Sequence, residues 1–165
     1  MHTRPMATST VPSPLGPVVL TGSDDGLASL SFGPDAAENA EGHVRDEGAF
    51  RQTAEQLEQW FAGERRDFDV PLALVGTAFQ VRVWELLCQV PYGTTTSYGV
   101  LAAELGSPGA SRAVGAANGR NRIGVIVPCH RVIGRDGTLT GYAGGLPTKR
   151  WLLAHESAHA GAALF

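Results

Sequence analysis

The sequence has few cysteines, no long hydrophobic run and little net charge. Only two of its 165 residues are cysteine, Cys88 and Cys129, too few for the disulfide framework of a small secreted domain. No apolar stretch approaches the roughly 20 residues that a transmembrane helix needs. The first 14 residues are polar and interrupted by proline, without the apolar core of a secretory signal. We therefore expect a cytoplasmic protein with reduced cysteines and no membrane partner.

The net charge of −3 hides an uneven distribution along the chain. Residues 1–75 contain five Lys and Arg against twelve Asp and Glu, whereas residues 76–165 contain eight against four. Only the second part has the sign of a nucleic-acid-binding surface, although a charge of this size is also typical of ordinary solvated surface. The change near Val75 and Gly76 predicts two small domains, residues 1–75 and 76–165.

The first domain is expected to be a structural α/β unit, because it contains no catalytic pattern. Asp25 and Gly26 lie between two apolar segments, and an Asp-Gly pair readily supplies the positive φ of a hairpin turn. Apolar residues at helical spacing precede Gly63, where a helix should end. The expected elements are a loose tail at 1–14, a hairpin of 18–21 and 27–32, a loop or marginal helix at 34–48, a helix at 50–61 and a short edge strand at 68–72.

The second domain opens with a capping box, in which Thr77 caps a helix and Gln80 follows three residues later. This helix should end at Pro91. Cys88 lies within it without a charged partner on its own face, so we interpret Cys88 as a core residue rather than a reactive thiol.

Two short helices joined by a glycine-containing turn then form a helix-turn-helix pattern. Ser97 can cap the first, residues 98–105, and the second should span residues 110–118. The second helix consists mostly of small residues, from which only Arg112 would project far. Small residues could simply pack this helix against its neighbours. Together with the turn and the basic charge, however, they favour close approach to DNA.

A thiol, an imidazole and a guanidinium follow one another after an apolar run. Residues 125–127 are β-branched and predict a strand buried on both faces, which Pro128 interrupts. Next to His130 and Arg131, Cys129 should lie in a positive field that favours the thiolate and lowers the pKa of the thiol. A free cysteine is most often an inert core residue, but the cationic neighbours make Cys129 a candidate nucleophile.

The segments after this candidate nucleophile predict a turn, a loop and a helix. Asp136 and Gly137 predict a second hairpin over residues 132–140, with the shape of a wing. Residues 141–145 form a glycine-rich loop around Tyr142, whose spacing differs from that of a phosphate-binding loop. Pro147 suits the first turn of a last helix, residues 148–158.

The last helix contains the pattern H-E-x-x-H at residues 155–159, which is also the signature of zinc proteases. That chemistry needs a third protein ligand, commonly from a later helix. Residues 160–165 contain no His, Asp or Glu. We therefore interpret the match as a coincidence and expect no metal and no cofactor.

Several motifs together resemble those of the O6-alkylguanine-DNA alkyltransferase family. They occur in the family's order and spacing across residues 77–156, whereas the likeness in the first domain is limited to SPLG at 13–16 and the hairpin at Gly26. The motifs are RAVG at 112–115, NGRN at 118–121, PCHRV at 128–132, GYAGGL at 141–146 and KRWLLAHE at 149–156. The resemblance implies an α/β (α+β) fold, with a small RNase-H-like α/β domain followed by a mostly helical, winged helix-turn-helix domain.

The resemblance also implies an activity. Family members transfer an alkyl group, commonly methyl, from O6 of guanine in double-stranded DNA to their own cysteine, once and irreversibly. O4 of thymine is a further candidate position. The damaged base must leave the duplex, because its alkylated edge is otherwise out of reach. The protein would bind from the minor-groove side as a monomer, with few base-specific contacts.

The family's catalytic roles fall on residues of this sequence. Cys129 would be the nucleophile and His130 its base, with Glu156 orienting the imidazole and Asn121 bracing the turn that presents the thiol. Arg112 would fill the gap that the flipped nucleotide leaves. The substrate-binding residues would be Tyr98, Asn118, Val132, Tyr142, Ala143 and Lys149. The DNA-contacting residues would be Ser97, Tyr98, Arg112, Ala113, Gly115, Arg120 and Arg131.

Four of these positions have more specific implied roles. Tyr98 would crowd the rotating phosphate and donate a proton to the departing base. Tyr142 would form the pocket wall, and the backbone of Ala143 would donate near O6. Asn118 departs from a position that is often apolar in the family, which leaves the size of the accepted alkyl group open.

Two functions of other classes remain open at this point. A non-enzymatic sensor of alkylated DNA shares the implied fold but lacks the cysteine of PCHR, so the presence of Cys129 argues against it. A Cys-His hydrolase or transferase acting on small molecules would also use Cys129, His130 and Glu156. Such an enzyme would need neither Arg112 nor a helix-turn-helix.

Overall fold

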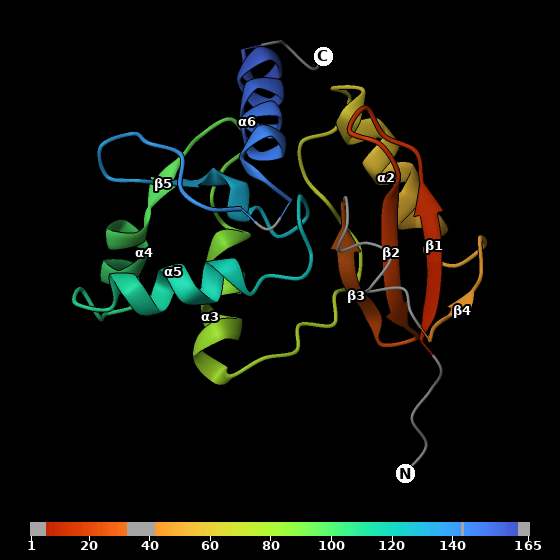
Figure 1. Cartoon of the computed structure of the whole chain (residues 1–165), viewed down its shortest axis with the longest axis horizontal. Coiled ribbons are helices and arrows are strands. Elements are labelled where there is room, and N and C mark those ends of the chain that lie inside the picture. The colour runs from red at the N-terminus through yellow and green to blue at the C-terminus, as the bar shows by residue number, and fades with distance from the viewer. Residues whose placement is uncertain (1–5, 33–41, 143, 162–165) are drawn as a thin grey trace. The chain divides into compact units, whose positions relative to one another are not determined.

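The computed structural model of the chain describes residues 6–32, 42–142 and 144–161 (Figure 1). It divides into two compact units, Met1–Leu74 and Val75–Phe165, next to the change in composition. Among the described residues no helix is both long and apolar enough to cross a membrane. Ala143 and residues 34–41 of the expected loop or marginal helix lie outside the described residues.

The N-terminal unit is built on a four-stranded sheet with the strand order β3-β2-β1-β4. Its strands are β1 (Ala7–Val11), β2 (Val18–Ser23), β3 (Gly26–Ser31) and β4 (Val44–Arg45). The pairs β1–β2 and β2–β3 are antiparallel, and β4 lies parallel to β1. The predicted hairpin is confirmed, because β2 and β3 meet at the pair of Ser23 and Gly26, where Gly26 has a φ of 131°.

The expectation of a loose tail at residues 1–14 is wrong for residues 7–11, and residues 1–5 lie outside the described part of the chain. Residues 7–11 form the inner strand β1, with Ala7 opposite Gly22 and Val11 opposite Val18. The strand ATSTV has little apolar character, so its alternation is a weak signal in sequence. Its hydrogen bonds to strands on both sides compensate for that weakness. The exposed two-residue strand β4 also lies where the sequence predicted a loop or helix.

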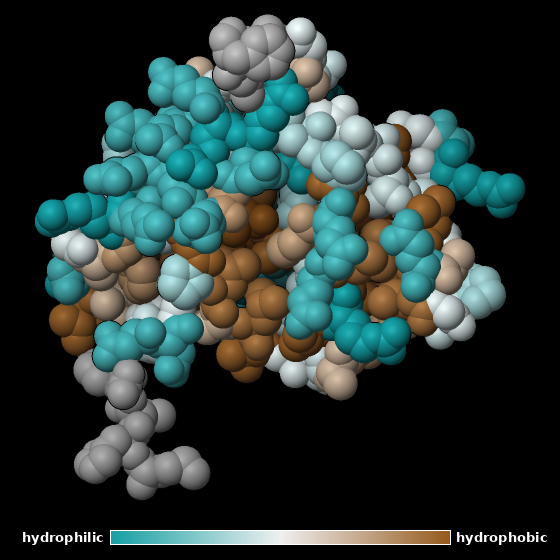
Figure 2. Space-filling view, turned by 180° about the vertical axis from the view of Figure 1, so that it is seen from behind, coloured by the Kyte–Doolittle hydropathy of each residue, from teal (hydrophilic) through white to brown (hydrophobic). Residues whose placement is uncertain are grey.

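The predicted N-terminal helix is confirmed as α2 (Arg51–Phe61). Leu57 and Trp60 are fully buried, whereas Glu55 and Glu58 face solvent. Figure 2 shows the hydrophilic side chains gathered over this helix, toward the upper left of the view. The helix is therefore amphipathic, as its sequence spacing predicts.

The expected edge strand at residues 68–72 is wrong. Within this described segment only Leu72 forms a bridge, to Leu27. Two backbone hydrogen bonds hold it: Leu27 N donates to Pro71 O at 3.0 Å, and Ala73 N donates to Leu27 O at 2.8 Å. Pro71 has no N–H to extend the ladder, so the pairing stops there.

The C-terminal unit is mostly helical. Its helices are α3 (Ala78–Leu87), α4 (Tyr98–Glu104), α5 (Ser111–Gly119) and α6 (Leu146–Ala160), with a 3-10 turn η1 (Cys129–Arg131) and the short parallel strands β5 (Thr96–Ser97) and β6 (Val132–Ile133). The predicted capping box is present, since Thr77 Oγ1 accepts from Gln80 N at 3.1 Å and Gln80 Oε1 accepts from Thr77 N at 3.0 Å. Pro147 lies in the first turn of α6, as predicted.

The helix-turn-helix pattern is confirmed by α4 and α5. The Ser97 hydroxyl caps α4 by accepting from Val100 N at 3.2 Å. The structure confirms the packing role for one face of α5, whereas close approach to DNA stays a prediction. Val114 and Ala117 pack inward, and the Ala117 carbonyl accepts from the indole N–H of Trp84 at 2.8 Å. Arg112 lies on the exposed face.

The interpretation of Cys88 as a core residue is wrong. Helix α3 ends at Leu87, earlier than Pro91, and Cys88 at its C-cap is exposed. The buried stripe of this helix runs through Val83, Trp84 and Leu87. Cys88 is one residue beyond that stripe, so the helical rotation directs it outward.

The expected wing hairpin is only a turn. Residues 138–140, which the structure describes, form no strand. Gly134 N donates to Thr138 O at 2.8 Å, and the Asp136 carboxylate accepts from the Thr138 hydroxyl at 2.7 Å. The preceding strand β6 pairs with β5 instead of with this segment.

The segment before Pro128 is buried, as expected, but it is not a strand. Ile126 N donates to Gly124 O at 2.8 Å and Val127 N donates to Ile123 O at 3.0 Å, so the chain turns tightly twice. Val125 has a φ of 68°, in the left-handed region where a β-branched residue is strained. The composition of a short apolar run indicates burial but not its backbone conformation, which is why the strand prediction failed.

We expect Val125→Gly to be at least as stable as Val125→Ala. In ordinary positions Gly is less stable than Ala by roughly 0.5–1 kcal/mol. At a φ of 68°, however, only glycine adopts the backbone without strain. Urea denaturation would give the free energies of unfolding.

Val127 is the matched control, because it is equally buried and has no positive φ. There the Gly variant should be the less stable of the two. The same order of stability at Val125 and Val127 would show that the backbone of Val125 is not strained.

Candidate active site

Cys129 begins the turn η1 at the end of the tightly turned segment. The residue is 7% exposed, and its backbone N donates to Val127 O at 2.7 Å. Asn121 braces the same turn: its Nδ2 donates to Val127 O at 2.8 Å and its Oδ1 accepts from Ile123 N at 3.0 Å. The Asn121 side chain also acts on the thiol, whose pKa it lowers. A single amide therefore braces the backbone before the thiol and influences the thiol itself.

The pKa of the Cys129 thiol lies above its ordinary value, opposite to the direction that the sequence predicted. Burial is the largest cause and raises this pKa, while the hydrogen bond with Asn121 and the charge of Lys149 lower it by less. The sequence neighbours His130 and Arg131 do not supply the expected field, because Glu156 engages both. Cys129 is therefore a shielded, neutral thiol in this state.

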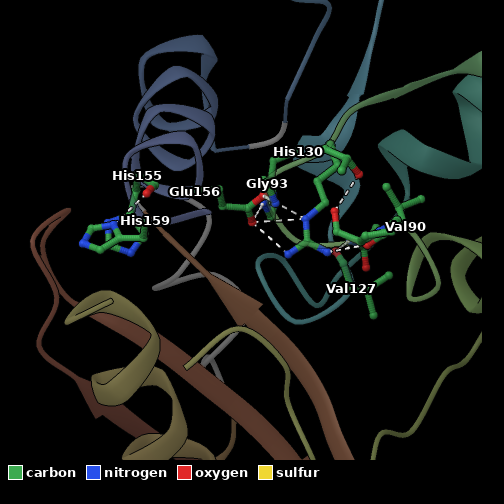
Figure 3. Close-up of polar contacts among 11 residues, drawn as sticks. Val90, Gly93, Val127, His130, His155, Glu156 and His159 are labelled. Carbon is green, nitrogen blue, oxygen red and sulfur yellow. Dashed lines mark hydrogen bonds and ion pairs between the residues drawn. The ribbon is translucent and has the colours of Figure 1, made fainter. Parts of the chain in front are cut away.

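His130 and Glu156 form a buried pair. Nε2 of His130 lies 2.6 Å from Oε2 of Glu156 (Figure 3), and the two side chains are 0% and 1% exposed. Burial is the largest influence on His130 and lowers its pKa, Glu156 raises it, and Arg131 and Lys149 lower it further. The imidazole is therefore neutral. Because an ionised carboxylate only accepts hydrogen bonds, Nε2 carries the proton and Nδ1 the lone pair.

Arg131 is the second partner of Glu156, which corrects its predicted place among the DNA-contacting residues. Its Nε lies 3.0 Å from Oε1 of Glu156 and its Nη2 lies 2.9 Å from Oε2. Nη1 donates to Val90 O at 2.6 Å, and the guanidinium lies over the ring of Tyr92, 5.6 Å from its centroid. This bidentate, charge-assisted pair is buried, so the carboxylate holds the guanidinium inside the protein.

Glu156 is ionised despite its burial. Burial alone would raise the pKa of its carboxyl, but hydrogen bonds from His130 and Arg131 outweigh burial and lower the pKa to about 2. The backbone N–H of Gly93 is a further donor, 3.2 Å from Oε1. The carboxylate thus accepts hydrogen bonds from the side chains of His130 and Arg131 and from the backbone amide of Gly93.

Gly93 and Val90 are site residues that the sequence analysis missed. Gly93 has a φ of 76°, and a Cβ on it would come within 2.5 Å of the Cβ of Ala160. Only glycine therefore lets this backbone approach α6 closely enough to reach Glu156. The PYG sequence at 91–93 signals a turn, but nothing in it indicates that the turn faces a carboxylate.

Lys149 is fully buried, at 0% exposure. Its Nζ donates to Val132 O at 2.6 Å and to Thr140 O at 3.1 Å. Burial lowers the pKa of Lys149, and the interaction with Cys129 raises it. The positive charge that acts on the thiol is therefore that of Lys149, and not those of His130 and Arg131 as the sequence predicted. Val132, predicted to bind substrate, is buried and uses its carbonyl to hold this lysine.

Tyr142 and Asn118 are two further groups among the predicted substrate-binding residues, of which the first is half-buried and the second buried. Burial raises the pKa of Tyr142 well above its ordinary value, and the charge of the Cys129 thiolate raises it further. A Cβ on Gly144 would lie 2.8 Å from the Tyr142 ring, so glycine is needed beside it. Asn118 is 5% exposed, and its Oδ1 has no hydrogen-bond partner among the described residues. Ala143 lies outside the described part of the chain.

The predicted DNA-contacting residues, Arg131 excepted, lie on or beside α4 and α5. Arg112, Ala113 and Arg120 are exposed. A Cβ on Gly115 would lie 3.7 Å from the ring of Tyr98, which therefore packs against α5. Ser97, half-buried, caps α4. Each of these positions is therefore exposed or half-buried on or beside the helix-turn-helix.

The H-E-x-x-H pattern does not bring its three side chains together. His155 and His159 lie on the other side of α6 from Glu156 (Figure 3). His155 stacks on Trp151, with ring centroids 4.9 Å apart, and the ring of His159 lies 4.4 Å from that of His155. Within the described ranges, no group of three or more His, Cys, Asp and Glu side chains is placed to hold a metal ion.

Comparisons with known proteins identify the family. Two family models match the chain: the ribonuclease-like domain of 6-O-methylguanine DNA methyltransferase at residues 6–74 and its DNA binding domain at residues 78–158. A methylated-DNA–protein-cysteine methyltransferase of Methanosarcina acetivorans is 51% identical over 146 residues, which cover 87% of this chain and 94% of that protein. The chain belongs to this methyltransferase family. Both the predicted family and the predicted two-domain fold are thereby confirmed.

Solved structures of the methyltransferase family agree with this fold. The O6-methylguanine methyltransferase of Mycobacterium tuberculosis is 48% identical, with a TM-score of 0.85 over 96% of this chain and 97% of that chain. The structure of the same organism's protein in complex with DNA is 49% identical, with a TM-score of 0.88 over 94% of this chain and 96% of that chain.

We expect acid to destabilise the native protein through Glu156. Its carboxyl has a folded-state pKa of about 2 against an ordinary value of 4.5, so the folded state binds this proton less readily than the unfolded state. The stabilising contribution is full above pH 4.5 and is lost as the pH falls through about 2. Glu156→Gln should therefore show a flatter decline of stability across this window. At pH 7 it should be less stable, because Arg131 remains buried without a counter-charge.

Urea unfolding at a series of pH values measures this difference. Glu104→Gln, an exposed carboxylate at the end of α4, is the matched control and should follow the native curve. If Glu156→Gln declined as steeply as the native protein between these pH values, Glu156 would not be the stabilising acid group.

Proposed function

We propose that this chain repairs alkylated DNA by direct reversal, accepting an alkyl group from O6 of guanine onto Sγ of Cys129 in one irreversible turnover. One arrangement carries the proposal: a buried thiol on a turn that Asn121 braces, followed in η1 by a neutral imidazole whose Nε2 is held by ionised Glu156. Nucleophile, base and orienting carboxylate are the parts that covalent transfer needs. Family membership supports the substrate class.

The proposed transfer is a displacement at the alkyl carbon. The thiol proton passes through one bridging water to the Nδ1 lone pair of His130, and the sulfur then attacks the alkyl carbon. The S–C bond forms as the C–O6 bond breaks, and the electron pair of that bond remains on guanine. Guanine takes up a proton as it leaves, for which Tyr98 is the proposed donor. The proton that the thiol releases balances the one that guanine gains.

The proposed step passes through a thiolate–imidazolium pair, which the charges of Lys149 and Glu156 would stabilise. The pKa of the thiol is raised and that of His130 is lowered, in both cases chiefly by burial, so the resting pair is neutral. Lys149 acts in the opposite direction on the thiol and Glu156 does so on His130. A thiolate–imidazolium pair would thus be stabilised at each end without an external base.

DNA is the proposed partner, because the related Mycobacterium tuberculosis protein has been solved in complex with DNA. The alkylated edge of guanine is inaccessible in the duplex, so the base must be extruded. The small exposed residues of α5 suit close approach to the minor groove, and Arg112 would occupy the vacated stack. We further propose that the protein acts as a monomer in the cytoplasm, since the transfer needs one thiol, kept reduced.

The native protein itself provides the decisive test against the two rival functions. Intact-protein mass spectrometry after mixing with duplex DNA that contains O6-methylguanine should show a permanent gain of one methyl group per molecule. DNA binding without a gain in mass would indicate a sensor. Unmodified protein that repeatedly hydrolyses an ester would indicate a small-molecule hydrolase.

Cys129→Ser should abolish methyl transfer while DNA affinity survives. A hydroxyl at this place is a far weaker nucleophile than a thiol. Cys88→Ser is the matched control, because Cys88 is the only other cysteine and is exposed; it should transfer normally. Peptide mapping identifies the modified residue. Alkyl on Cys88, or an active Cys129→Ser protein, would overturn the assignment.

Arg112→Ala should slow repair of duplex DNA far more than reaction with free O6-benzylguanine. Extruding a base costs a few kcal/mol, so losing the side chain that fills its place should cost on the order of tenfold to a hundredfold in rate. The free base requires no extrusion. Single-turnover kinetics with both substrates measure the two losses.

Arg51→Ala, which removes an exposed arginine from α2 in the other unit, controls for the general loss of positive charge. It should leave both rates near those of the native protein. Equal losses on both substrates in Arg112→Ala would argue against a role in filling the stack.

A further inference from the structure

One hydrogen bond connects the DNA-facing helix pair with the segment that leads to α6. The Tyr98 hydroxyl lies 2.5 Å from Oγ1 of Thr140, across 42 residues of sequence. Tyr98 is the first residue of α4, and its ring packs against Gly115 of α5. Thr140 lies between β6 and α6, two residues before Tyr142. A side chain of the helix-turn-helix is thus tied to the segment between β6 and α6.

The backbone of Thr140 makes a second connection, to the thiol itself. Its carbonyl accepts from Nζ of Lys149 at 3.1 Å. Lys149 is buried, and its charge lowers the pKa of the Cys129 thiol. Thr140 therefore lies between the tyrosine that faces DNA and the lysine that acts on the nucleophile.

We propose that Thr140 is a positioning residue for the transfer reaction: its hydroxyl sets the direction of the Tyr98 hydroxyl, while its carbonyl holds Lys149, whose charge acts on Cys129. The proposal rests on the proposed function. Thr140 belongs to none of the motifs that carry the family resemblance, so the sequence offered no signal for it.

The chemical reason lies in the single proton of a phenol. When Tyr98 donates to Thr140, it cannot donate to a departing base. A threonine hydroxyl both donates and accepts, and it can rotate between the two arrangements. When Thr140 donates to the phenol oxygen, the Tyr98 proton is free to point at the base. The same hydrogen bond stabilises the negative charge that the phenol oxygen gains as its proton leaves.

Thr140→Val tests the side-chain role, because valine keeps the shape and the carbonyl but removes the hydroxyl. At saturating duplex DNA, its single-turnover transfer rate should fall by about tenfold, the scale of one hydrogen bond to a developing charge. DNA affinity should stay unchanged. The pH dependence of transfer should also stay unchanged, since the carbonyl that holds Lys149 remains. Thr140→Ser restores a hydroxyl and should recover most of the rate.

Thr138→Val is the matched control, because the Thr138 hydroxyl belongs to the same segment but bonds Asp136 instead. It should transfer at the native rate. Tyr98→Phe supplies the coupling test: Thr140→Val should cause no additional loss in a Tyr98→Phe background, since the bond is already absent.

Several results would overturn this inference. They are losses that add in the double variant, a Thr140→Ser protein as slow as Thr140→Val, an equal loss in Thr138→Val, or a shifted pH profile in Thr140→Val. The result with the native protein distinguishes failure of the proposed function from failure of the role of Thr140. If it acquires no methyl group, the proposed function fails. If it does, and Thr140→Val transfers as fast, only the role of Thr140 fails.

Discussion

The ionised carboxylate of Glu156 is the constraint on which the rest of the site depends. A carboxylate in the interior of a protein is tolerated only when donors surround it. Here His130, Arg131 and Gly93 supply those donors. In meeting that requirement they hold α6, η1 and the loop after α3 against one another. The carboxylate in turn determines which nitrogen of His130 carries the proton. Structural stability and readiness for catalysis thus come from the same set of hydrogen bonds.

Local features of the fold could be predicted from the sequence because their causes are local. The capping box of Thr77 and Gln80, the Asp-Gly turn before β3 and the Pro147 start of α6 each depend on residues within a few positions of one another. Strand β1 could not be predicted in this way. Its sequence is nearly neutral, and the partners that make it a strand lie elsewhere in the chain.

The site shows the same division between local and long-range causes. The sequence predicts that Cys129, His130 and Arg131 belong to one site, but it places the two cationic side chains around the sulfur. A 3-10 helix has about three residues per turn, so consecutive side chains project in directions roughly 120° apart. His130 and Arg131 therefore reach Glu156, and Lys149 from α6 acts on the thiol. Geometry also separates Glu156 from its sequence neighbour His155, so the short zinc-protease pattern carries no information about this helix.

The burial of Cys129 has a consequence for the lifetime of the molecule. A protein that is consumed by its own reaction must keep its sulfur intact during a long wait for a damaged base. Oxidants and stray electrophiles react chiefly with exposed thiolates. A shielded thiol with a raised pKa presents little thiolate to them. The low reactivity of the resting thiol therefore limits side reactions before a substrate arrives. The cysteine is preserved for a substrate that can enter the site, where the surrounding charges stabilise the thiolate.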